Sequence, residues 1–151
     1  MIQVLEVSSE AQMRILGRQL ARLLKGGECL ELIGDVGAGK TTLVKGIANG
    51  LGIDEAVQSP SFTISRVYTA DSLSLHHYDF YRLPDAGILE YEFAESVSDP
   101  TVITIVEWAD IVHDILPKAR IRITIVPFAE TSRRVTIEGD ISRIELASEG
   151  T

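Results

Sequence analysis

A glycine-rich stretch at residues 34–42, GDVGAGKTT, carries residue types suited to binding the phosphates of a nucleotide. Gly34, Gly39, Lys40 and Thr41 have the spacing G-x-x-x-x-G-K-[ST] of a P-loop. In such a loop the glycines let backbone amides turn toward the phosphates, the lysine reaches the β and γ phosphates, and the hydroxyl ligates Mg²⁺. The sequence therefore predicts a triphosphate-binding loop. Its predicted binding residues are Gly34, Asp35, Val36, Gly37, Ala38, Gly39, Lys40, Thr41 and Thr42.

A P-loop enzyme also needs carboxylates, which hold Mg²⁺ and orient the attacking group. They are expected at the C-terminal ends of neighbouring strands, where ligands bind open α/β sheets. Glu107 directly follows the apolar run TVITIV, and Asp79 lies near the end of LSLHHYDFY. Glu107 is the better match, because two histidines interrupt the strand before Asp79. The alternatives are a surface carboxylate for Glu107 and a salt bridge with Arg82 for Asp79.

Three further features near these carboxylates each admit two interpretations. His76 and His77 suggest a metal site, but adjacent strand residues point to opposite faces of a sheet, so we expect structural or hydrogen-bonding roles. Trp108 is equally suited to the core and to the wall of an active site. The loop SPSFT at residues 59–63 could sense a γ-phosphate as switch segments do, or be an ordinary proline-initiated turn.

The P-loop needs a strand before it and a helix after it, and the sequence supplies both. Residues 28–33, ECLELI, indicate a strand, and apolar residues at helical spacing between 43 and 51 indicate a helix. A strand at residues 2–7 and a helix capped by Ser8 or Ser9 come earlier in the chain, and Gly26 and Gly27 end that helix.

After the P-loop helix, the patterns favour more strands than helices. Strands are expected at residues 61–68, 73–81 and 101–106, a weak helix at 84–96, and a hairpin from 120–126 and 133–138. The run TVITIV is typical of a strand buried on both faces. This order predicts the α/β class, with a three-layer, P-loop NTPase-like fold whose central parallel sheet carries added antiparallel strands.

Length and composition indicate one domain. A chain of 151 residues with 45% hydrophobic content supports a single core, which we expect over residues 1–140, followed by a polar C-terminal tail at 141–151. The single cysteine, Cys29, excludes an internal disulfide and is expected to be a buried thiol. The sequence has no secretory signal pattern and no apolar run near 20 residues, so a cytoplasmic protein without a membrane span is expected.

The charge balance argues against direct nucleic-acid binding. Fourteen basic and 22 acidic residues give a formal net charge of −8, whereas proteins that hold DNA or RNA usually present a basic face. A nucleic-acid role is therefore expected to run through a partner. A local basic patch remains an alternative, formed by Arg14, Arg18, Arg22 and Lys25.

Four motifs together resemble the TsaE family, formerly called YjeE: GDVGAGKTT at 34–42, SPSFT at 59–63, HYDFYRL at 77–83 and EWAD at 107–110. The similarity in order and spacing extends over roughly residues 8–138. It implies a small bacterial P-loop ATPase with a mixed sheet, using ATP and Mg²⁺, with low activity in the absence of partners. It also implies action with the TsaB and TsaD proteins in making N6-threonylcarbamoyladenosine in tRNAs that read ANN codons. The ATPase would reset or stimulate the TsaD–TsaB complex rather than transfer the carbamoyl group.

The resemblance also implies roles for individual residues. Thr41 and Glu107 would be Mg²⁺ ligands, and Asp79 would be the Walker B-type acid that supports hydrolysis and the metal shell. Lys40, Asp79 and Glu107 would form the catalytic set. Trp108 belongs to the Glu-Trp pair beside the nucleotide.

Two further positions follow from the resemblance. Ser61 would contact the nucleotide and stands where the family more often has threonine, so the hydroxyl is kept. Arg133 matches an arginine that family members carry near the start of the last strand, as a nucleotide contact.

Two other functions remain open on sequence grounds. A small-molecule kinase would need an acceptor pocket and an arginine-bearing lid, and no arginine-rich lid segment is evident between residues 110 and 132. A non-catalytic nucleotide sensor would use binding alone to drive assembly. A GTPase is disfavoured, because the guanine-reading motif N-K-x-D does not occur in the sequence.

Overall fold

The computed structural model describes residues 1–35, 37–54, 56–57, 65–81, 83–85 and 87–146. Its strands are β1 (Ile2–Val7), β2 (Cys29–Ile33), β3 (Ser65–Thr69), β4 (Ser74–Asp79), β5 (Val102–Glu107), β6 (Ile121–Pro127) and β7 (Arg133–Glu138). Its helices are α1 (Glu10–Leu23), α2 (Lys40–Gly50), α3 (Leu89–Ser98) and the 3-10 helix η2 (Ala109–Ile115). None of the helices in these ranges is long and apolar enough to cross a membrane.

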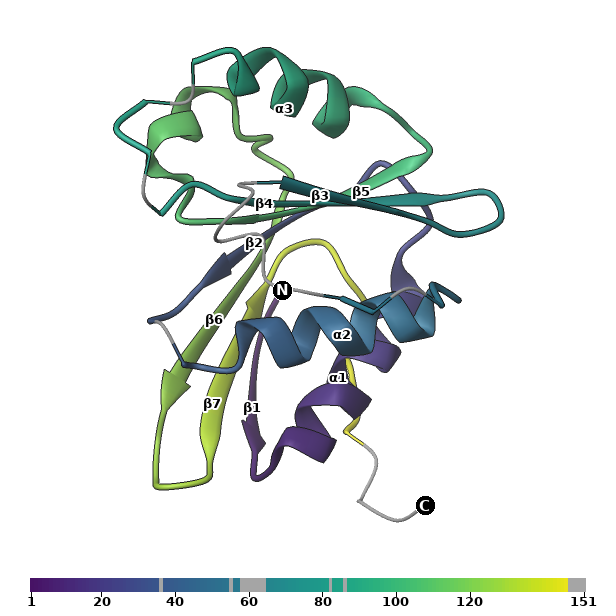
Figure 1. Ribbon diagram of the computed structural model, residues 1–151. Coiled ribbons are helices and arrows are strands. Elements are labelled where there is room, and N and C mark those ends of the chain that lie inside the picture. Colours follow the sequence, from purple (N-terminus) through teal and green to yellow (C-terminus); the bar gives the residue numbers. More distant parts are fainter. Residues whose placement is uncertain (36, 55, 58–64, 82, 86, 147–151) are drawn as a thin grey trace.

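The described strands form one mixed sheet in the order β1-β7-β6-β2-β5-β4-β3 (Figure 1). At its centre β2 pairs in parallel with β5 and β6, and β4 pairs in parallel with β5. Antiparallel pairs extend both sides, β3 on β4 and the hairpin β6–β7 followed by β1. This arrangement confirms the predicted α/β fold, with a parallel centre and antiparallel additions.

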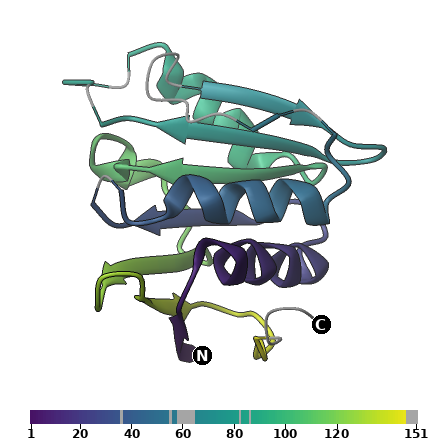
Figure 2. The same ribbon diagram turned by 60° about the horizontal axis from the view of Figure 1, so that its bottom comes forward.

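Helices cover both faces of the sheet and make three layers. Figure 2 shows α1 and α2 side by side on one face, with α3 on the opposite side of the strands. The core under α1 and α2 includes Leu16, Leu20, Leu30, Leu32, Leu43, Ile47, Leu75, Ile103 and Ile105. A second, smaller core under α3 and η2 includes Tyr78, Phe80, Phe93, Val106 and Val112. Along the central strands, residues of the first core alternate with residues of the second core. Each side chain of these strands can therefore be assigned to one face of the sheet.

Helix α1 begins where the sequence predicts. The Ser9 side chain accepts a hydrogen bond from the Gln12 backbone N–H at 3.1 Å, the contact of an N-cap, which typically stabilises a helix by about 1 kcal/mol. The buried positions Met13, Leu16 and Leu20 then recur every three or four residues and face the sheet.

Glycines let α1 and α2 approach backbone to backbone. A Cβ atom added at Gly46 would lie 2.3 Å from the Arg14 carbonyl oxygen, and one at Gly17 would lie 2.5 Å from that of Leu43. Real Cβ atoms do not come this close to backbone, so both positions require glycine at the observed helix separation. The P-loop helix is thereby packed firmly against α1.

Strand β5 is buried along its whole length, as its β-branched composition predicts. The neighbouring Cys29 at the start of β2 is also buried, 3% exposed, which confirms the expected buried thiol. Burial, assisted by the charge of Glu31, raises the pKa of this thiol to about 12.

Two local elements differ from the predictions. The helix expected at 84–96 runs from Leu89 to Ser98, since Pro84 and Gly87, which has a φ of 54°, occupy a turn before it. The 3-10 helix η2 was not predicted, because its residues lack a clear helical period. The strand expected at 61–68 is described from Ser65 onward, and residues 61–64 lie outside the described residues.

The segment after β7 returns to the sheet. Ile144 is 4% exposed and belongs to the main core, its N–H donates to Gln3 Oε1 at 2.9 Å, and its carbonyl accepts from Gln3 Nε2. The tail predicted from residue 141 therefore begins with a segment that contributes a core side chain. One domain over residues 1–140 remains a prediction, and residues 147–151 lie outside the described part of the chain.

Candidate nucleotide-binding site

The glycine-rich loop joins the end of β2 to the start of α2. Gly39, with a φ of 107°, immediately precedes α2, and the helix has no side-chain cap, so backbone N–H groups of its first turn remain available to an anion. Gly34 passes close to β6: a Cβ there would lie 2.8 Å from the Ile125 carbonyl oxygen. A positive φ thus favours glycine at position 39, and the close approach to β6 requires glycine at position 34. Val36 lies outside the described residues.

Lys40 is 7% exposed, and its ammonium group makes three contacts at the mouth of the loop. Nζ donates a hydrogen bond to the Gly34 carbonyl, lies 3.4 Å from Glu107 Oε1, and lies 4.7 Å from the centroid of the Trp108 ring. The charge is therefore held beside the P-loop by protein groups that a phosphate could replace.

The two predicted carboxylates lie side by side at the ends of adjacent parallel strands. Asp79 and Glu107 are register partners of β4 and β5 and are 7% and 4% exposed. Strand alternation places both on the sheet face covered by α2, because Leu75 in β4 and Ile105 in β5 belong to the core beneath that helix. Asp79 Oδ1 accepts a hydrogen bond from the Tyr81 N–H at 3.0 Å. Arg82, its predicted alternative partner, lies outside the described residues.

Glu107 is ionised in spite of its burial. Burial raises the pKa of its carboxyl, but a hydrogen bond and charge from His77, followed by the charge of Lys40, outweigh this effect and lower the pKa below its ordinary value of 4.5. His77 Nε2 lies 2.6 Å from Glu107 Oε2, while Lys40 contacts Oε1. The two carboxylate oxygens thus have different partners.

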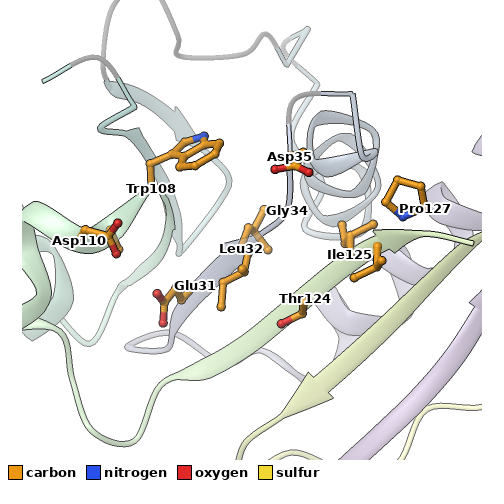
Figure 3. Close-up of a pocket in the computed structure, with 12 residues that line it drawn as sticks. Glu31, Leu32, Gly34, Asp35, Trp108, Asp110, Thr124, Ile125 and Pro127 are labelled. Carbon is orange, nitrogen blue, oxygen red and sulfur yellow. The ribbon is translucent and has the colours of Figure 1, made fainter.

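Phosphate-binding groups and carboxylates converge on one pocket of about 270 Å³. Its lining residues are Glu10, Gly37, Gly39, Lys40, Thr41, Thr42, Asp79, Tyr81, Glu107 and Trp108. A second pocket of about 310 Å³ lies between β2, β6 and Trp108 and is lined by the predicted loop residues Gly34 and Asp35 (Figure 3). It lacks Lys40, Asp79 and Glu107, so the residues able to do phosphate chemistry belong to the smaller pocket.

Trp108 forms a wall of both pockets rather than part of a core. It is the non-glycine residue with positive φ in the described ranges, with φ 54° and ψ 55°, a conformation disfavoured for a bulky side chain. Its ring lies against Tyr81, with 4.6 Å between the ring centroids. The tyrosine and the Lys40 ammonium therefore hold the indole at the edge of the candidate nucleotide pocket.

The donor set of this pocket fits a magnesium ion bound with a nucleotide. Thr41, Asp79 and Glu107 present oxygen atoms to one space, and Mg²⁺ prefers oxygen ligands. Within the described residues no group of three or more His, Cys, Asp or Glu side chains could hold a metal by itself. Mg²⁺ at nucleotide sites is usually bound by one or two protein oxygens together with phosphates and water, which this arrangement allows.

Several residues of the site were not predicted in these positions. His77 was expected to have a structural or hydrogen-bonding role, and it bonds directly to Glu107; its position two residues before Asp79 on the same strand was the available signal. Tyr81 lies within the motif HYDFYRL but was given no role of its own, and Glu10 belongs to none of the four motifs.

Of two other predicted nucleotide contacts, Arg133 lies among the described residues and Ser61 does not. Arg133, matched only through the family resemblance, donates from Nε to the Ala38 carbonyl at 3.2 Å and lines a small pocket with Ala38 and Thr42. Its side chain therefore reaches the P-loop backbone. Ser61 and the whole SPSFT loop lie outside the described residues, so both interpretations of that loop remain predictions.

Comparisons with known proteins agree with this geometry. The family model described as "Threonylcarbamoyl adenosine biosynthesis protein TsaE" matches residues 7–135. Proteins named "tRNA threonylcarbamoyladenosine biosynthesis protein TsaE" are similar over most of the chain. The one from Bacillus subtilis is 37% identical, over 90% of this chain and 85% of its own length. The one from Streptomyces coelicolor is 41% identical, over 84% and 90%.

A solved structure has the same fold. The crystal structure of YdiB from Bacillus subtilis aligns with a TM-score of 0.74 and 33% identity, covering 91% of this chain and 84% of that one. The family match at residues 7–135 includes the P-loop, both carboxylates and the strands that position them. By sequence and by fold, the chain belongs to the TsaE family.

Proposed function

We propose that this protein is the Mg²⁺-dependent ATPase subunit of the machinery that forms N6-threonylcarbamoyladenosine in tRNAs reading ANN codons. The names of its relatives, which are tRNA threonylcarbamoyladenosine biosynthesis proteins, support the pathway. The observation that carries the ATPase assignment is the convergence of Lys40, Thr41, Asp79 and Glu107 on one pocket.

The P-loop would bind the triphosphate. Backbone amides at the start of α2 and the Lys40 ammonium would stabilise the negative charge that grows on the β–γ bridging oxygen during hydrolysis. For this, Lys40 exchanges its contacts with Gly34 and Glu107 for phosphate oxygens, which are stronger acceptors of a charged donor. Thr42 would add a hydroxyl near the α-phosphate, and Trp108 would border the phosphates.

The carboxylates would complete the reaction centre. A bound Mg²⁺ ion would supply charge neutralisation to the phosphates. Thr41 and Glu107 would hold it, directly or through water, and Asp79 would orient the attacking water or the metal's water shell. Asp79 and Glu107 are suited to these separate tasks because they are neighbours in register and their strands fix their spacing.

The substrate chemistry would take place on partner proteins. The formal charge of −8 opposes direct tRNA binding, and we propose that the TsaD and TsaB proteins carry the tRNA while ATP hydrolysis here resets or stimulates their complex. This role would place the protein in the cytoplasm with its tRNA substrates. We propose that residues 1–140 form a single P-loop domain.

ATP turnover measured with and without the TsaD–TsaB complex tests this proposal. Turnover that the complex stimulates, together with modified adenosine in the tRNA that depends on this chain, is the expected result. No stimulation by the complex would overturn the partnership. Phosphoryl transfer from ATP to a nucleoside or sugar by the isolated chain would instead favour a kinase.

A further inference from the structure

His77 is a fully buried histidine whose ring is directed at the candidate site. It is 0% exposed, and its Nε2 lies 2.6 Å from Glu107 Oε2. The two residues come from adjacent strands and are 30 positions apart in the chain. His76, the preceding residue, belongs to the opposite face of β4, so only one of the two adjacent histidines can reach this carboxylate.

The hydrogen in this contact belongs to the histidine. A carboxylate that binds a metal is ionised and can only accept hydrogen bonds, so in a metal-binding site Nε2 would carry the N–H that joins the two groups. Oε2 is occupied by this bond, whereas Oε1 faces the Lys40 ammonium at 3.4 Å. The histidine therefore fixes the orientation of the Glu107 carboxylate in which the other oxygen faces the P-loop.

We propose that His77 is a positioning residue, which holds Glu107 in the rotamer that presents Oε1 to a nucleotide-bound Mg²⁺. The inference rests on the proposed function and identifies a residue that makes its metal site effective. A free glutamate side chain loses rotamer entropy when it is fixed, and the His77 bond fixes it before the metal arrives. Partners of this kind typically contribute 10- to 100-fold to metal affinity.

The test compares nucleotide affinity with and without metal. Calorimetry gives the Kd of a non-hydrolysable ATP analogue in EDTA and in excess Mg²⁺, and the ratio of the two measures how strongly the metal promotes binding. Three substitutions of His77 distinguish the position of the hydrogen-bond donor from the size of the side chain. In Gln the amide N–H lies three bonds from Cβ, as Nε2 does in histidine, whereas in Asn it lies two bonds from Cβ. Met fills the space but has no donor.

The expected result is specific to the metal. H77N should reduce the Mg²⁺ enhancement at least about tenfold while the Kd in EDTA stays within about twofold of the wild-type value. H77Q should restore most of the enhancement. H76N is the matched control and should behave as the wild type. Thermal unfolding checks that each variant is folded, and H77M replaces H77N if the latter is not.

Other results would overturn the assignment. An unchanged Mg²⁺ enhancement in folded H77N or H77M would show that Glu107 needs no positioning. An equal loss of the Mg²⁺ enhancement in H77Q and H77N would show that the Nε2 donor is not the cause. An equal weakening of nucleotide binding in EDTA would show that the substitution affects the phosphate contacts rather than the metal. If the wild-type protein bound the nucleotide under neither condition, the proposed function itself would fail, which is a separate outcome.

Discussion

The ammonium of Lys40 lies 4.7 Å from the centroid of the Trp108 ring, so the P-loop lysine is in direct contact with the residue that follows β5. A cation over an indole face is stabilised by about 0.5–2 kcal/mol. The same ammonium lies 3.4 Å from Glu107 Oε1. A bound triphosphate would compete for one charge that three groups share, and this competition can be measured.

Nucleotide binding should change the fluorescence of Trp108. It is the single tryptophan of the chain, and transfer of Lys40 from the indole to a phosphate alters the field at the ring. Titration with ADP or ATP should shift the emission maximum or intensity and saturate at the Kd found by calorimetry. W108F gives the silent control. Unaltered emission at saturating nucleotide would mean that Lys40 keeps its contact with the ring.

Replacing Lys40 by methionine should weaken ATP binding about 10- to 150-fold. This range corresponds to the 1.5–3 kcal/mol of a hydrogen bond to a charged group. Lys45, exposed on the same helix, provides the control, and K45M should bind as the wild type does. Calorimetry in EDTA isolates the phosphate contact from metal effects. Equal Kd values for K40M and K45M would contradict the P-loop assignment.

Changing Asp79 to asparagine should reduce ATP turnover about 100-fold or more in the presence of TsaD and TsaB, and leave nucleotide binding in EDTA unaltered. The carboxylate is expected to orient water in the transition state, where such groups contribute at least about 10²-fold. D114N, at an exposed position of η2, is the control. Wild-type turnover by D79N would remove Asp79 from the catalytic set and favour a nucleotide sensor.

The pKa of Cys29 predicts a loss of stability in alkali. The thiol of the unfolded chain ionises near its ordinary pKa of 9.0, whereas the folded thiol keeps its proton until about pH 12. Its stabilising contribution is therefore complete below pH 9 and falls as the pH rises from 9 toward 12, by about 1.4 kcal/mol per unit. Urea unfolding of the wild type and C29A across this range should show a steeper decline for the wild type. Parallel pH profiles would contradict the assignment.

Gly46→Ala should destabilise the fold, although alanine is normally the better helix former. The added methyl group would meet the Arg14 carbonyl oxygen at 2.3 Å and force α1 and α2 apart, and overpacking of this kind costs about 1–3 kcal/mol. Asn49→Ala, at an exposed position of the same helix, should be neutral or slightly stabilising. Urea denaturation of both variants measures the difference, and an equally stable G46A would show that the helices can separate without cost.

Features encoded in short stretches of sequence were predictable. The run TVITIV before Glu107 indicates a buried strand without any knowledge of its neighbours, and β5 is buried throughout. The P-loop glycines and the cap of α1 are also local signals. Asp79 was found for the same reason, because a strand end can be recognised from the residues that precede it.

Contacts between distant segments could not be predicted this way. The bond between His77 and Glu107 depends on the register of β4 against β5, and the one between Arg133 and Ala38 joins residues 95 positions apart. Strand order and register result from the packing of all layers together, so no single stretch specifies them. The contacts of Trp108 with Tyr81 and Lys40 likewise join residues from different segments.

The pairing of β1 with β7 has a consequence for synthesis of the chain. Val7 lies opposite Arg133 and Ile2 opposite Glu138, so β1 leaves the ribosome well before its partner strand has been made. At about 5–20 residues per second, the delay is on the order of ten seconds. During that time the P-loop, α1, α2 and the strands of the parallel centre are synthesised, while β1 still lacks its partner strand. This edge of the sheet is therefore completed only after the nucleotide-binding segments have been synthesised.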